Sequence, residues 1–149
     1  MVQEINSPKA VHRLRILLVL VLVLLAIQGW FGDTTNIFVT TGTANPVAFS
    51  LGAITPVIIS YGPILIWHAL EGLILIALSL LAIPLTFVWT NKRSVRIMSI
   101  LGSAAIVSAA FGGLSFVASG FAAGGYSAQM GGSFIGAFGV YFVALYFTK

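Results

Sequence analysis

His68 and Glu71 are the residues of this chain whose types and spacing suggest chemistry. They lie in IWHALEGLILIA (66–77), and Glu71 is the single Asp, Glu, Lys or Arg between Asp33 and Lys92. A spacing of three places the pair on one face of a helix. An imidazole can bind haem iron or exchange a proton, and a neutral carboxyl group can donate a proton or anchor a ligand such as a quinone. The pair therefore predicts either a site or a set of mutually hydrogen-bonded polar groups.

Other apolar segments are expected to bring polar groups to the same level as His68. Gln28 lies near the end of the first segment, and Ser115 and Ser133 lie at corresponding positions in the last two. Met130 could complete a His/Met pair of haem ligands. A single acidic residue in the apolar segments is too few for a two-metal carboxylate site. The candidate cofactor-binding residues are His68, Glu71, Gln28 and Met130. The cofactor itself is left unknown, with haem and a quinone as the two candidates, and no metal-ion site or catalytic residue is predicted.

The elements that must position these residues are membrane helices. Hydrophobic residues make up 59% of the 149 residues and charged residues 7%, with a mean hydropathy of +1.09. A soluble domain has about 25% charged residues, because it needs a wetted surface. The composition therefore predicts that lipid is the solvent of this chain. The absence of cysteine excludes disulfides and thiolate sites.

Four segments are long and apolar enough to cross a bilayer, which takes about 20 residues. They cover residues 14–31, 63–89, 97–119 and 130–147. The sequence AIQGWFGD lacks a clear signal-peptide cleavage site, so we expect the first segment to remain as a span. The predicted fold is all-α: a four-helix integral membrane bundle that forms one domain over residues 1–149.

The cations predict the orientation. All seven Lys and Arg residues fall on one side of a four-span arrangement, at Lys9, Arg13, Arg15, Lys92, Arg93, Arg96 and Lys149. Positive charge favours the cytoplasmic side, so both termini are expected there, with the protein in the cell membrane. The same distribution explains the pI near 9.9 without a nucleic-acid partner.

Small residues in the last two spans predict close helix packing. Ala105, Ala109 and Gly113 recur every four residues in one span, and Gly132 and Gly136 have GxxxG spacing in the next. In lipid, small residues let helix backbones approach each other. We therefore expect these residues to line a tight contact between the third and fourth spans.

Residues 33–62 form a long, apolar extracytoplasmic loop in this arrangement. Its Thr, Val, Ile and Phe content is typical of strands, so it could form a strand pair or an interfacial segment over the helix ends. It could equally be a docking surface, because contiguous exposed apolar area usually marks an interface.

Three functions remain open. The first is a small non-catalytic subunit of a membrane complex, including an accessory subunit of a membrane enzyme, with other subunits or a second copy as partners. The second is an electron-transfer subunit that binds haem, a pigment or a quinone through His68 and Glu71. The third is a small proton-coupled transporter that uses Glu71. An enzyme acting alone is the least favoured, since no catalytic constellation is recognisable.

Overall fold

The protein is all-helical over the residues that the computed structural model describes, which are 6–39 and 44–149. The helices are α1 (Pro8–Val39), α2 (Leu51–Ser60), α3 (Pro63–Trp89), α4 (Arg93–Ala118) and α5 (Gly124–Phe147). All but α2 are long and apolar enough to cross a membrane. The expected all-α fold with four long apolar helices is therefore confirmed.

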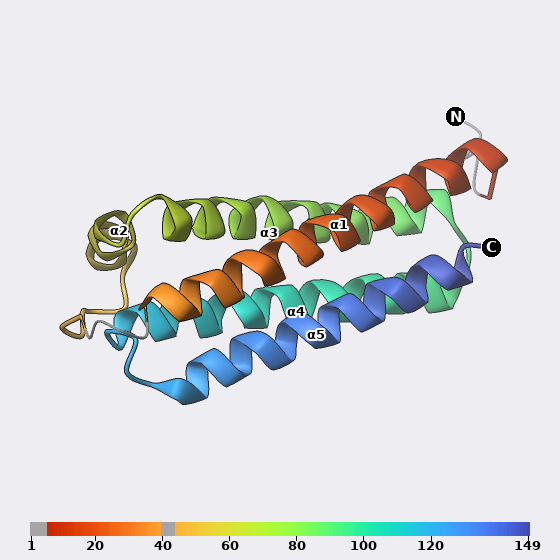
Figure 1. The fold of residues 1–149 in the computed structure, drawn as a ribbon. Helices are drawn as coiled ribbons and strands as arrows, with labels where there is room; N and C mark the ends of the chain where they lie inside the picture. The colour runs from red at the N-terminus through yellow and green to blue at the C-terminus, as the bar shows by residue number, and fades with distance from the viewer. Residues whose placement is uncertain (1–5, 40–43) are drawn as a thin grey trace.

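The four long helices form a closed bundle (Figure 1). Contacts join α1 to α3, α3 to α4, α4 to α5 and α5 back to α1, and the α4–α5 contact is the most extensive. The start of α1 and the C-terminus lie at one end of the bundle, which we call the terminal end. The short helix α2 lies across the other end, which we call the α2 end, where it contacts α3 and α4.

Local sequence signals explain where the helices begin. Ser7 precedes Pro8 and accepts a hydrogen bond from the Ala10 amide at 3.1 Å, so α1 begins with an N-cap followed by proline. Ser50 caps α2 by accepting from the Ala53 amide at 3.3 Å. In a membrane, helices satisfy their own backbone groups, so apolar segments of this length adopt no other open structure.

The core of the bundle is a set of apolar stripes with helical spacing. Leu14, Leu18, Val21 and Leu25 of α1 are buried and belong to one cluster with Ala137, Tyr141 and Ala144 of α5. The opposite faces carry large exposed apolar side chains, including Leu73, Ile135 and Phe142. A bundle that is apolar inside and outside is suited to contact with lipid.

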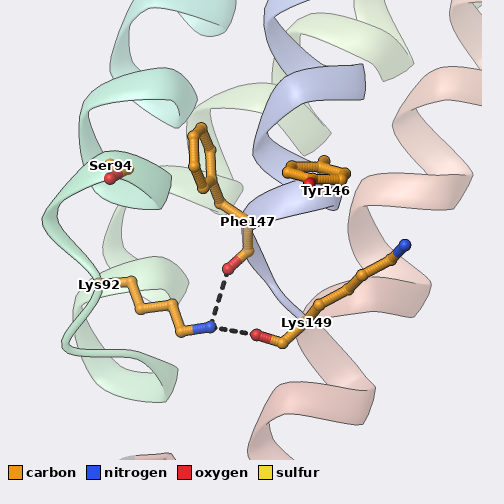
Figure 2. Close-up of a pocket in the computed structure, with 5 residues that line it drawn as sticks. All are labelled: Lys92, Ser94, Tyr146, Phe147 and Lys149. Atoms are coloured by element: carbon orange, nitrogen blue, oxygen red, sulfur yellow. Dashed lines mark hydrogen bonds between the residues drawn. The ribbon is translucent and has the colours of Figure 1, made fainter.

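At the terminal end, basic side chains donate hydrogen bonds to main-chain oxygens at the C-termini of helices. Lys92 Nζ donates to the main-chain oxygen of Phe147 at 2.9 Å and also to that of Lys149 (Figure 2). Arg96 Nε donates to the Thr90 carbonyl at 2.9 Å, beside the C-terminus of α3. Cations at helix C-termini satisfy free carbonyls and favour the helix dipole.

The segment 33–62 differs from the expected loop. Helix α1 continues through Val39, and residues 51–60 form α2, so the strand-pair interpretation is wrong for these parts. Ile54 of α2 is buried against Val117 and Ala118 of α4. Helix is favoured because residues 51–60 lie over the bundle end, where no strand of the described residues supplies hydrogen bonds and a helix satisfies its own backbone groups.

Helix boundaries also differ from the expected spans. Helix α1 begins six residues before position 14, α4 begins at Arg93 and α5 begins at Gly124. The additional turns contain charged, polar or glycine residues, which hydropathy does not identify as membrane-spanning. The segment 63–89 coincides with α3.

Small residues do form the α4–α5 contact, but the expected residues of α5 do not. A Cβ added to Gly112 of α4 would lie 3.1 Å from the Met130 main-chain nitrogen, whereas one added to Gly132, Gly136 or Gly139 would meet nothing within 4 Å. The prediction that Gly132 and Gly136 line this interface is wrong. Helix α5 instead presents Ala137, Tyr141 and Ala144 to the core, so its glycine face points outward.

Candidate functional site

Gln28 of α1 and His68 of α3 meet in the half of the bundle nearer the α2 end. The Gln28 Nε2 and His68 Nε2 atoms are 3.5 Å apart, a long hydrogen bond. His68 is half-buried and lies five residues after Pro63, so it is about 7.5 Å along α3 from its start. The expected proximity of Gln28 to His68 is therefore present in the structure.

Glycines on both helices make room for this contact. A Cβ added to Gly72 would lie 3.3 Å from Gln28 Nε2, so the amide lies across α3 at this point. A Cβ added to Gly32 would lie 3.5 Å from His68 Cε1. Because glycine has no side chain, the two polar groups fit between helices that otherwise pack through apolar residues.

Glu71 lies one turn beyond His68 and faces the protein interior. Its side chain is 8% exposed, and neither carboxyl oxygen has a hydrogen-bond partner within the described part of the chain. Gln28 Oε1 and His68 Nδ1 are also buried and lack partners there. A buried polar group without a partner is costly, so this cluster needs a physical explanation.

The remaining candidates lie at other contacts. Ser133 donates to Ser108 Oγ at 3.0 Å, across the α4–α5 contact. Met130 is half-buried and packs on α4, where its sulfur would be 3.3 Å from a Cβ at Gly113. Ser115 lines a shallow pocket at the α2 end with Phe49, Ala118, Ser119 and Tyr126. Haem ligation by His68 and Met130 stays a prediction.

A second polar cluster lies in the half of the bundle nearer the termini. Ser103 Oγ is 2.7 Å from the Ser79 carbonyl oxygen, 2.8 Å from the Ser99 carbonyl oxygen and 3.0 Å from the Tyr141 hydroxyl. All four side chains are buried. In the sequence, the spacing of Ser99 and Ser103 by one helical turn is the feature that could have indicated this cluster. The position of Tyr141 near a helix end does not reveal which face of α5 it occupies.

The outward face of α5 carries a regular stripe, which we call the α5 seam. Successive members are separated by four, three, four, three and four residues, and all are exposed: Gly125, Gln129, Gly132, Gly136, Gly139 and Val143. This spacing averages about 3.6 residues, the repeat of an α-helix, so the six residues form one continuous stripe along α5. Within the described part of the chain, nothing lies within 4 Å of a Cβ built on any of its four glycines. Small residues at this repeat form a surface that another helix can approach closely.

Comparisons of this chain with protein family models, with characterised proteins and with solved structures find no match.

Proposed function

We propose that the protein is a small non-catalytic subunit of an integral membrane complex, and that the α5 seam packs against a transmembrane helix of a partner. The observation that carries this proposal is the seam itself, in which Gly132 and Gly136 face outward without a neighbour. The partner is a second copy of this chain or another membrane subunit.

The reason is the physics of helix association in lipid. Lipid tails are as apolar as leucine, so helices associate through close van der Waals packing and interhelical hydrogen bonds. The seam supports both, since its glycines allow close approach and Gln129 offers a carboxamide. Gln129 Nε2 is already near Ser108 Oγ, at 3.4 Å, which holds its side chain beside α4. A partner helix would bury this exposed amide.

The experiment compares leucine substitutions at three kinds of glycine. Gly132→Leu and Gly136→Leu should each shift the native mass in mild detergent to that of the dissociated protein, while thermal stability stays unchanged. The matched control is Gly131→Leu, because Gly131 also has nothing within 4 Å of a Cβ but lies off the seam. Gly112→Leu should instead unfold the chain, since its side chain would meet the α5 backbone.

Two outcomes separate the possible partners, and one rejects the proposal. A complex formed by the purified chain alone identifies a second copy, whereas a complex that needs an added subunit identifies another protein. If the Gly132→Leu and Gly136→Leu variants keep the native mass of the unmodified protein, the seam is not an assembly surface.

The orientation belongs to the same proposal. We place the terminal end of the bundle in the cytoplasm, because the α3–α4 connection and the start of α1 carry the cations. The α2 end, with its apolar covering helix, then faces the outer side of the cell membrane. Docking against a partner would occur within the bilayer, along α5.

A further inference from the structure

Unpartnered polar atoms concentrate at one place in the bundle. Over the described residues, five buried side-chain nitrogen or oxygen atoms have no hydrogen-bond partner, and four of them belong to Gln28, His68 and Glu71. We call these three residues the polar triad. Glu71 is more than nine-tenths buried, so a large group from outside the bundle has little access to its carboxyl oxygens.

We infer that the polar triad is a binding site for one exchangeable proton, shared between His68 and Glu71 and accommodated by Gln28. This role does not depend on the α5 seam. The two groups are three residues apart on α3, where side chains on one face are neighbours with Cβ atoms about 5–6 Å apart. A carboxyl and an imidazole at this separation titrate as a coupled pair.

The hydrogen positions follow from the Gln28–His68 contact. When the Gln28 amide nitrogen donates to His68 Nε2, the ring is neutral and its hydrogen lies on Nδ1. That Nδ1–H group is buried and unpartnered, and the Glu71 carboxyl group lies one turn along the helix. Sharing the proton requires a side-chain rotation of Glu71 that places a carboxyl oxygen at Nδ1.

Gln28 can accommodate both states of the pair. In one state the proton is on a Glu71 oxygen and His68 is neutral. In the other state the ring hydrogen lies on Nε2, the Glu71 O–H bond has broken and a new N–H bond has formed at Nδ1, giving an imidazolium and a carboxylate; the pair has no net charge in either case. The imidazolium carries hydrogen on Nε2, which needs an acceptor. Rotation of the Gln28 amide by about 180° presents its unpartnered Oε1 atom there. A serine or asparagine at this position would have less reach.

A proton fits these ligands better than a metal ion. No group of three or more His, Cys, Asp and Glu residues that could hold a metal occurs within the described ranges. A sodium or calcium ion prefers about six oxygen ligands, whereas Gln28 and Glu71 together supply three. One proton requires one carboxyl group and one acceptor, which the pair provides.

Few other titratable groups face the polar triad. Helix α3 packs against α1, α2 and α4. Helix α2 contains no titratable residue, and those of α4 are Arg93 and Arg96, at the terminal end. Helix α1 has Lys9, His12, Arg13 and Arg15 near the terminal end, and exposed Asp33 near the α2 end. Tyr61, between α2 and α3, packs on Phe121. Asp33 is therefore the carboxyl group that an experiment must distinguish from Glu71.

Infrared spectroscopy tests the inference on a protein that keeps the polar triad intact. The chain contains two glutamates, Glu4 and Glu71, and one aspartate. Isotope labelling of glutamate carboxyl groups, with Glu4→Gln to leave one label, isolates the Glu71 carboxyl band. This band should change reversibly between about pH 4 and about pH 10 in protein reconstituted into lipid, since that range spans ordinary carboxyl and imidazole titration.

Variants then test the coupling. His68→Gln should move the midpoint of the Glu71 titration by about one pH unit or more, because the pair no longer shares the proton. Asp33→Asn is the matched control and should leave the midpoint unchanged. A Glu71 band that is constant over the range overturns the inference. So does a band that follows sodium concentration at constant pH, or a midpoint that His68→Gln does not move.

Discussion

Tyr141 makes two contacts with α4 in the half of the bundle nearer the termini, one through its hydroxyl group and one through its ring. Its hydroxyl donates to Ser103 Oγ, because the single Ser103 hydrogen is directed to a carbonyl oxygen. Its ring lies against α4, where a Cβ at Gly102 would come within 2.5 Å of Cε2. One residue therefore combines a buried hydrogen bond with a close contact that requires glycine opposite it.

Replacing Tyr141 with phenylalanine should destabilise the bundle by about 0.5–1.5 kcal/mol, the usual net contribution of one hydrogen bond. The ring contact would remain, so the native fold should be kept. Tyr146→Phe is the control, because Tyr146 is 63% exposed and its hydroxyl does not lie in the core. Denaturant unfolding in detergent measures both. Equal stability of Tyr141→Phe and the unmodified protein would show that the Ser103 hydrogen bond contributes nothing net.

At the scale of elements, the segment that precedes α2 is attached to the end of α4. The Val47 amide donates to the Ala118 carbonyl at 2.8 Å. Gly120 then has φ of +67°, and a Cβ on it would overlap the Ala44 carbonyl oxygen. The segment before α2 is thus attached to the end of α4 at a point where only glycine fits.

Gly120→Ala should destabilise the protein by more than about 1–2 kcal/mol, because strain at positive φ adds to the overlap with Ala44. Gly52→Ala, within α2, meets nothing within 4 Å and should be neutral or stabilise by about 0.5–1 kcal/mol. Thermal unfolding of the two variants in the same detergent gives the comparison. If Gly120→Ala and Gly52→Ala unfold at the same temperature, the contact at Gly120 does not determine the position of α2.

The whole molecule has two chemically different ends. The terminal end carries cations that bind helix carbonyls, as Lys92 and Arg96 do. The α2 end is covered by the apolar α2, and Trp67, near that end, is 60% exposed, as expected for an aromatic ring in the headgroup zone. This asymmetry is what supports a single orientation in the membrane.

The orientation predicts how single cysteines react from outside the cell. The chain has no native cysteine, so each introduced thiol is unique. Ala48→Cys, in the exposed segment before α2, should react with a membrane-impermeant reagent, whereas Ser94→Cys, at the start of α4, should react only after the membrane is opened. Both positions are exposed in the structure, so accessibility within the protein is comparable. The reverse pattern would place the termini outside.

The sequence by itself determined the four long helices and the concentration of cations at one end. These properties are set by the length and composition of each segment, since about 20 apolar residues must form a helix in lipid. The level of His68 within the bundle, and the presence of Gln28 at a similar level, also followed from counting along helices. Such features depend on local chain geometry, which spacing alone specifies.

Only the tertiary structure decided which face of each helix meets a neighbour. Helices α4 and α5 both contain small residues on more than one face, so the sequence could not show that Gly112 lines the contact while Gly132 and Gly136 face outward. Likewise, a tyrosine near a helix end suits both a headgroup zone and a core, and the serines of two other helices decided that Tyr141 is buried. Helix rotation depends on the simultaneous packing of all four long helices, and small residues and polar residues fit more than one rotation equally well.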